Sequence, residues 1–124
     1  MGKKKNIYNL PATHSTPEIV IDYDNKVIKM SGRCILEDPH TFFFELLQKI
    51  VFIDDLKYVI ELEYLNSSSL RHLFSIIRSE LTLKEVEWIY DEEDFDMGEK
   101  GNYFKEMVND KHPDVIFNLI EKPR

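Results

Sequence analysis

Residues 64–71, with the sequence Tyr-Leu-Asn-Ser-Ser-Ser-Leu-Arg, join a predicted buried strand to a predicted amphipathic helix. The strand covers residues 56–65, an apolar run rich in β-branched and aromatic residues. After Asn66 the apolar residues recur at spacings of three and four, as on one face of a helix. These helical positions are Leu70, Leu73, Phe74, Ile77 and Leu81. A helix is therefore predicted to begin within the serine run.

The polar residues of this turn suit the start of a helix, because their short side chains can bond the free N–H groups of the first turn. We predict Asn66 as turn-former and cap, with Ser68 and Ser69 as donors of the first turn. Capping alone would explain the serines, and spacing alone favours that explanation. The alternative is a phosphorylation switch, since a phosphate here would face the positive end of the helix dipole.

Composition limits the classes of protein to consider. At 124 residues the chain predicts one domain, and no apolar run approaches the roughly 20 residues of a membrane-spanning helix. The net charge of −7 argues against general nucleic-acid binding, so protein partners are expected. The single cysteine, Cys34, excludes an internal disulfide and agrees with a reducing compartment, which predicts the cytoplasm. The three lysines Lys3, Lys4 and Lys5 precede no apolar segment, so they predict a solvated basic tip and no secretory signal.

The remaining elements predict a single α/β domain over residues 1–124. Residues 1–16 carry little periodicity and are expected to be an extended or partly disordered leading segment. Two short strands flank the Asp22–Asn25 turn, and Ser31-Gly32 closes that hairpin. The other predicted elements are a helix capped by Asp38 with Pro39 at its first position, a strand at 86–90, a helix at 96–110 and an apolar segment at 115–120. Strands alternating with helices, behind a hairpin, favour a mixed sheet with helices packed on one face.

The chain resembles the SiaC-like bacterial regulatory phosphoproteins, whose fold is similar to the STAS domains of anti-sigma factor antagonists. The resemblance covers nearly the whole length and rests on an ordered set of motifs. They are Ser15-Thr16-Pro17-Glu18, Gly32 with Glu37-Asp38 before Phe42-Phe43, the run from Leu62 to Ser69, the run from Trp88 to Asp94, Asp96-Met97, Gly101, Phe104 and Phe117-Asn118-Leu119-Ile120.

The resemblance implies partner switching without enzymatic activity or a cofactor. In that family the residue after the Asn of the turn is reversibly phosphorylated, and the matching residue here is Ser67. A Ser/Thr protein kinase would phosphorylate it, and a PP2C-type phosphatase would reverse the reaction. The unphosphorylated form would bind a downstream effector such as a diguanylate cyclase. An alternative is an anti-sigma factor antagonist that binds a sigma-regulating kinase.

The acidic run Asp91-Glu92-Glu93-Asp94 permits a second class of function. Oxygen-rich clusters suit magnesium or calcium, so a metal-dependent hydrolase is a further alternative. Four adjacent carboxylates on a loop cannot all converge on one ion, and charge runs are usually solvated. A patch that faces a partner is the better interpretation, and no metal site is predicted.

Two further sets of residues are candidates for partner binding. The polar face of the predicted serine helix carries Arg71, His72, Ser75 and Arg78, which contact either a partner or solvent. Phe44 lies at the edge of the apolar face of the preceding helix, because successive residues point about 100° apart. The favoured interpretation tucks Phe44 under the neighbouring loop, and the alternative is an exposed aromatic anchor.

Overall fold

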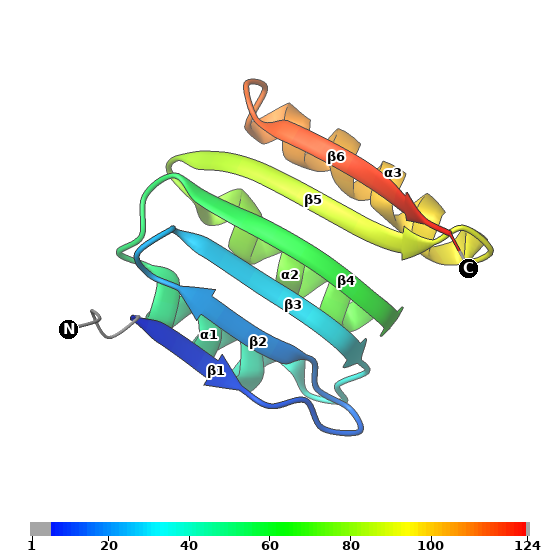
Figure 1. Cartoon of the computed structure of the whole chain (residues 1–124), viewed down its shortest axis with the longest axis horizontal. Coiled ribbons are helices and arrows are strands. Elements are labelled where there is room, and N and C mark those ends of the chain that lie inside the picture. The colour runs from blue at the N-terminus through cyan, green and yellow to red at the C-terminus, as the bar shows by residue number, and fades with distance from the viewer. Residues whose placement is uncertain (1–5, 124) are drawn as a thin grey trace.

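The predicted hairpin at the front of the chain is present in the computed structural model, which describes residues 6–123 (Figure 1). The elements in chain order are β1 (Ile7–Leu10), β2 (Glu18–Asp22), β3 (Val27–Cys34), α1 (Pro39–Ile50), β4 (Leu56–Leu65), α2 (Ser67–Ser79), β5 (Leu83–Asp91), α3 (Phe95–Lys111) and β6 (Ile116–Lys122). Asp22 holds the hairpin turn, because its carboxylate accepts the backbone N–H of Asn25 at 3.0 Å and the side-chain amide of Asn25 at 2.8 Å. Lys26 completes the turn with a φ of 57°.

The strands form one six-stranded mixed sheet in the order β1-β2-β3-β4-β5-β6. β2 is antiparallel to both of its neighbours, β1 and β3, whereas β3 to β6 run parallel to one another. Each parallel connection passes through one helix, and all three helices lie behind the sheet in Figure 1. This arrangement confirms the predicted α/β architecture with helices on one face.

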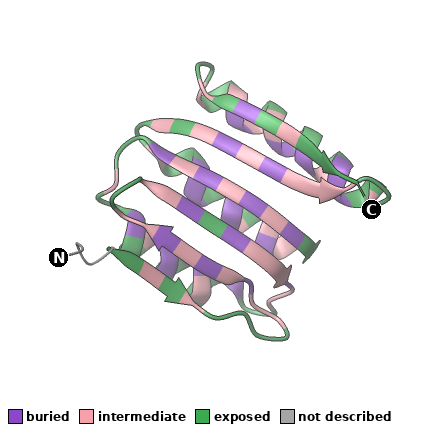
Figure 2. Ribbon diagram, viewed as in Figure 1, coloured by how far each residue is buried: buried purple, intermediate pink, exposed green. Residues whose placement is uncertain are grey.

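The core lies between the sheet and the helices. Along β2 to β5 buried residues alternate with less buried ones, so each strand turns one set of side chains toward the helices (Figure 2). The largest fully buried side chains belong to Trp88, Tyr58 and Phe104. Among the described residues no helix covers the other face of the sheet, which is largely polar, with Lys57 paired to Glu85 at 3.2 Å and to Glu87 at 2.9 Å.

Several element boundaries differ from those predicted. Strand β1 was not predicted and pairs with β2, so residues 7–10 belong to the sheet. The prediction for residues 1–5, with their lysines, lies outside the described residues. Strand β3 continues past Ser31-Gly32 to Cys34, since Gly32 adopts a φ of 105° where the pairing with β4 shifts register. Asp38 occupies the cap position of α1 but its side chain makes no capping hydrogen bond.

The prediction that Leu81 lies on the apolar face of the serine helix is wrong. Helix α2 ends at Ser79 because Glu80 turns extended, with a ψ of 131°, and Leu81 is 97% exposed beyond it. Glu80 is held in that position by the Tyr58 hydroxyl, which donates to its carboxylate at 2.9 Å. No helix within residues 6–123 is long and apolar enough to cross a membrane.

Candidate functional site

Asn66 fixes the junction between β4 and α2 through both its backbone and its side chain. Its backbone N–H donates to the Cys34 carbonyl at 3.1 Å, and its side-chain amide donates to the Leu36 carbonyl at 3.0 Å. Its side-chain oxygen accepts the Ser69 N–H at 3.0 Å. Asn66 is therefore the cap of α2, as predicted, and it also ties the turn to the end of β3 and the loop that follows.

A bulge in β4 sets the direction of this junction. Leu62 pairs with Gly32 and Tyr64 pairs with Arg33, which leaves Glu63 as an extra residue in β4. A bulge shifts the alternation of side chains by one residue. Leu65 is consequently buried although it breaks the alternation of β4, and the chain leaves the sheet directly into α2.

The three serines of the turn differ in their accessibility. Ser67 is exposed at the first position of α2, Ser68 is half-buried, and Ser69 is fully buried. Ser69 donates its backbone N–H to Asn66, as expected of a first-turn donor. Only the first two hydroxyls of the run can therefore be reached from solvent.

The buried Ser69 hydroxyl lies against the thiol of Cys34, the last residue of β3. Burial raises the pKa of Cys34 to about 11, and the interaction with Ser69 opposes that rise. A thiol is a weak hydrogen-bonding group, and no stronger partner satisfies the Ser69 hydroxyl. The pair packs the start of α2 onto β3, with Cys34 as a small buried residue at the end of that strand.

The predicted polar face of α2 divides into two parts. Arg71, Ser75 and Arg78 are exposed, and they continue from Ser67 along one side of the helix. Arg78 lies over the ring of Phe74, with 5.9 Å from its guanidinium carbon to the ring centre. His72 points toward α1 instead, where it stacks on Phe43 with ring centres 6.0 Å apart.

The favoured interpretation of Phe44, that it tucks under the neighbouring loop, is wrong. Its side chain is 51% exposed and stacks on the ring of His40, with ring centres 6.1 Å apart. His40 lies in turn 6.3 Å from His72 of α2. Phe44 is thus an exposed aromatic residue on α1, on the side of the helix that faces away from the core.

The acidic run forms the turn between β5 and α3. The Asp91 carboxylate accepts the Glu93 N–H at 2.9 Å, and the Asp94 carboxylate accepts the Met97 N–H at 3.1 Å as the cap of α3. Two of the four carboxylates are thereby used in shaping the turn. Within residues 6–123 no group of three His, Cys, Asp or Glu side chains is placed to hold a metal ion.

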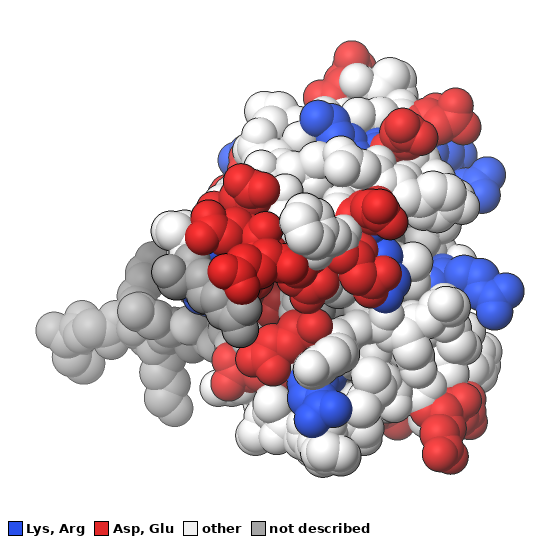
Figure 3. Space-filling view, turned by 90° about the vertical axis from the view of Figure 1, so that its right-hand side faces the viewer, with Lys and Arg blue, Asp and Glu red and all other residues white. Residues whose placement is uncertain are grey.

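Three residues of this run line a depression of about 910 Å³ on the open face of the sheet, at the ends of β3, β4 and β5. They are Asp91, Glu93 and Asp94. Carboxylates of Glu18, Glu61 and Glu63 add to the same wall, and Figure 3 shows acidic side chains gathered on this side of the molecule. The acidic surface is therefore broader than the run of four residues that the sequence singles out.

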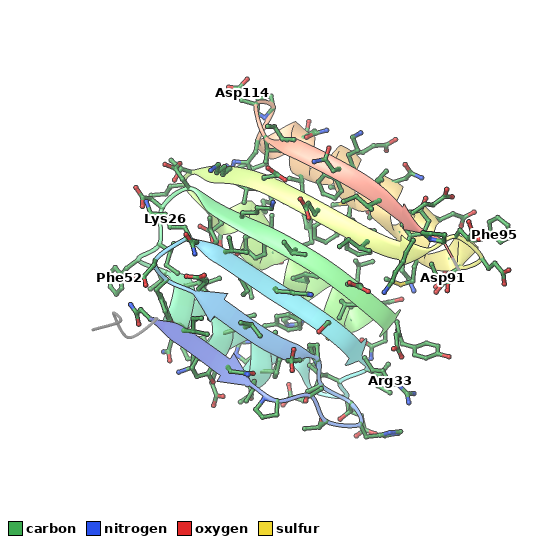
Figure 4. All side chains as sticks on the ribbon, in the orientation of Figure 1. Lys26, Arg33, Phe52, Asp91, Phe95 and Asp114 are labelled. Atoms are coloured by element: carbon green, nitrogen blue, oxygen red, sulfur yellow. The ribbon has the colours of Figure 1, made fainter. Side chains whose placement is uncertain are left out.

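Two exposed aromatic residues near the turn were missed in the sequence analysis. Tyr64 is 57% exposed beneath the guanidinium of Arg33, which lies 4.9 Å from the ring centre. Phe95, at the start of α3, is 80% exposed, and Figure 4 shows it with Arg33 and Asp91 at the same end of the sheet. Tyr64 lies in a strand that otherwise alternates, and only the bulge at Glu63 turns it outward. No sequence signal marks that bulge apart from Gly32 on the neighbouring strand.

Lys100 links α3 to the serine turn. Its ammonium donates to the Leu65 carbonyl at 2.9 Å and to the Asp96 carboxylate at 2.7 Å. The carbonyl belongs to the residue just before Asn66. The turn is consequently held from α3 as well as from β3.

Comparison with known proteins identifies the family. A family profile described as SiaC family regulatory phosphoprotein matches residues 10–121. No curated protein sequence matches the chain. Apo-SiaC from Pseudomonas aeruginosa is similar in structure with a TM-score of 0.70 at 17% identity, over 93% of this chain and 98% of that one.

A second likeness is to a chain in the crystal structure of the diguanylate cyclase SiaD in complex with its activator SiaC from Pseudomonas aeruginosa. The TM-score is 0.71 at 21% identity, over 94% of this chain and 99% of that one. At these identities the solved structures show a shared fold, and the match to the family profile covers most of the chain. The protein whose serine turn, single-sided helices and mixed sheet are described above thus belongs to the SiaC family of regulatory phosphoproteins.

Proposed function

We propose that the protein is a non-enzymatic phosphorylation switch, with Ser67 as the phosphorylated residue. The observation that carries the proposal is the difference in burial along the serine run. Ser67 is exposed at the first position of α2, whereas Ser69 is fully buried against Cys34. A kinase must bring the acceptor hydroxyl into its own active site, and Ser67 meets that requirement without unfolding of the turn.

The start of α2 supports a phosphate at this position. The side-chain oxygen of Asn66 already accepts the N–H of Ser69, and the N–H of Leu70 donates to the Asn66 carbonyl at 2.9 Å. The N–H groups of Ser67 and Ser68 are left to face an anion at the positive end of the helix dipole. Arg71 lies one turn further along the same exposed side and adds a cation.

Phosphorylation would control binding by changing charge in the middle of a docking surface. The surface has Ser67 near its centre, with Arg71, Ser75 and Arg78 on α2 and Tyr64 at the end of β4. A phosphate adds roughly −1.5 to −2 charges, which would have to be desolvated when a partner docks. The partner is therefore bound by the unphosphorylated form and released by the phosphorylated form.

The family and the solved relative support our choice of partners. The Pseudomonas aeruginosa SiaC is described as the activator of the diguanylate cyclase SiaD, so a diguanylate cyclase is the effector that we propose for this chain. A Ser/Thr protein kinase and a PP2C-type phosphatase would set the phosphorylation state. Both the kinase and the cyclase consume nucleoside triphosphates, and the proposal accordingly places the protein in the cytoplasm.

The first test is phosphopeptide mass spectrometry on protein taken from its native cells with phosphatases inhibited. Phosphate on Ser67 is expected. The variants Ser67→Ala and Ser68→Ala form a matched pair, because they remove neighbouring accessible hydroxyls from the same turn. Ser67→Ala should escape phosphorylation and keep its effector when kinase is added, while Ser68→Ala should behave as wild type.

Phosphate on Ser68, or release of the effector from Ser67→Ala on addition of kinase, would contradict the assignment. Copurification of the protein with its bound partner identifies the effector. A diguanylate cyclase agrees with the proposal, whereas a sigma-regulating kinase would favour the anti-sigma factor antagonist alternative.

A further inference from the structure

The outer edge of β6 is an open sheet edge. β6 (Ile116–Lys122) pairs with β5 in an unbroken register, and no other strand of residues 6–123 pairs with it (Figure 1). An edge strand exposes a row of backbone N–H and C=O groups that can pair with another strand. With seven residues, β6 is long enough to form a stable pairing of this kind.

The opposite edge of the sheet is protected. β1 has only four residues, and Pro11 follows it directly. A very short edge strand is a device by which proteins avoid pairing at an edge, because it offers few backbone groups to another strand. β6 is likewise followed by a proline, Pro123, but it has seven residues. The two edges are thus unequal, and β6 is the one left open.

The sequence around β6 is close to a chemical palindrome centred on Asn118. Residues 113–123 read Pro-Asp-Val-Ile-Phe-Asn-Leu-Ile-Glu-Lys-Pro. An antiparallel pairing of two such segments about Asn118 sets Ile116 opposite Ile120 of the second copy, and Asn118 opposite itself. Asp114, in the turn before β6, and Lys122, at the end of β6, carry opposite charges at the two ends of this segment.

We propose that the chain forms a two-fold symmetric dimer by antiparallel pairing of β6 with β6 of a second copy. Ile116 and Ile120 are 56% and 38% exposed. In the dimer, Ile116 of each copy packs against Ile120 of the other copy across the line where the two β6 strands meet, the apolar join. Lys122 pairs with Glu61 of β4 at 2.8 Å, so its charge is directed over the sheet and away from the apolar join. The two sheets become one continuous sheet.

The dimer is compatible with the phosphorylation switch. Ser67 follows β4, and β5 lies between β4 and the edge strand β6. Asp114, in the turn before β6, lies at the other end of this strand from Asp91 and Phe95 (Figure 4). Both serine turns of a dimer therefore stay accessible.

Sedimentation velocity on the full chain tests the dimer over a range of micromolar concentrations. The wild type is expected to reach twice the chain mass of 14.8 kDa. Ile120→Lys places a charge against the apolar join and should leave only monomer. Ile7→Lys is the matched control, because Ile7 is a 44% exposed isoleucine on the protected edge strand, and this variant should remain dimeric. A monomeric wild type throughout the range, or a dimeric Ile120→Lys, would overturn the proposal.

Two variants with one added cysteine each test the β6 pairing if Ile120→Lys does not fold. Directly opposed residues in antiparallel strands have Cα atoms about 4.5–5.5 Å apart, within the range that a disulfide spans. Asn118→Cys should crosslink into a covalent dimer on mild oxidation, while Asn9→Cys on β1 should not. Cys34 is buried and takes no part. Equal crosslinking of the two variants, or none for Asn118→Cys, would exclude pairing through β6.

Discussion

The three serines of the turn have the same side chain and three different environments. Each helical residue is rotated by about 100° from the one before, so two steps move from the exposed Ser67 to the buried Ser69. The sequence predicts the helix and its cap, but the direction of the first serine depends on the bulge at Glu63. A bulge arises from pairing between distant strands, and local periodicity does not record it.

Cys34 carries a prediction at the scale of one residue. Burial raises its pKa to about 11, from an ordinary value of 9.0, so the folded state disfavours the thiolate. The stabilisation from the neutral thiol is fully present below about pH 9 and is lost as pH rises toward 11. At 1.36 kcal/mol per pH unit, the loss is about 2–3 kcal/mol in the free energy of unfolding.

Urea denaturation of wild type and Cys34→Ala between pH 8 and 11 measures this loss. The two proteins share every other titrating group, including Tyr58, whose pKa is also raised by burial. The difference between their unfolding free energies should therefore shrink or reverse as pH rises. A constant difference across this range would show that the Cys34 thiol titrates as it does in the unfolded chain.

At the scale of elements, strong periodicity was sufficient to predict β4, α2 and β5. Boundaries were less predictable where the backbone departs from the local pattern. Strand β1 was missed because four residues give too little alternation to recognise, and its pairing with β2 is what defines it. Helix α3 forms over the predicted residues although Gly98 and Gly101 reduce helix propensity.

Gly101 is explained by packing that the sequence does not show. A Cβ atom at this position would lie 2.6 Å from the Trp88 ring and 2.7 Å from the Leu119 side chain. The Trp88 side chain cannot easily move aside, because it is fully buried and its indole N–H donates to the Met97 carbonyl at 3.0 Å. Glycine is thus required where α3 approaches the sheet most closely.

Gly101→Ala should consequently destabilise the protein, although alanine is the better helix former. Overpacking costs about 1–3 kcal/mol, and the gain in helix propensity returns about 1 kcal/mol. We expect a net loss of up to about 2 kcal/mol in urea denaturation, by the same principles. Glu106→Ala, at an exposed position of the same helix, should change stability by less than about 0.5 kcal/mol. A stabilised Gly101→Ala would mean that α3 can move away from Trp88 at little cost.

At the scale of the whole molecule, the switch requires no change of fold. Asn66 and Lys100 tie the serine turn to β3 and α3, so a phosphate on Ser67 is added to a rigid site. The phosphorylated protein should give a nearly unchanged amide NMR spectrum outside the turn. Its unfolding free energy should rise by about 0.3–1 kcal/mol at low salt, and the gain should fade as salt screens the helix dipole.

Thermal unfolding of the phosphorylated and unphosphorylated forms, at low and high ionic strength, checks this expectation. Ser67→Ala treated with the same kinase serves as the control, because it passes through the same handling without the phosphate. Spectral changes spread over the sheet, or a large drop in stability, would show that phosphorylation acts by rearranging the fold.

The architecture of the whole molecule was predictable, and the distribution of its surface groups was only partly so. Strands alternating with helices predict a mixed sheet covered on one face, and that prediction is confirmed. The acidic depression was not predictable, because Glu18, Glu61 and Asp91 come from three separate strands that only the sheet brings together.

The order of strands in the sheet repeats their order in the chain. During synthesis each strand therefore emerges after the neighbour against which it pairs, and no strand has to be inserted between two that are already joined. A ribosome-bound chain can extend its sheet one strand at a time from β1, each crossover helix covering the latest addition. Such a chain can adopt its native layering before its C-terminal residues have left the exit tunnel.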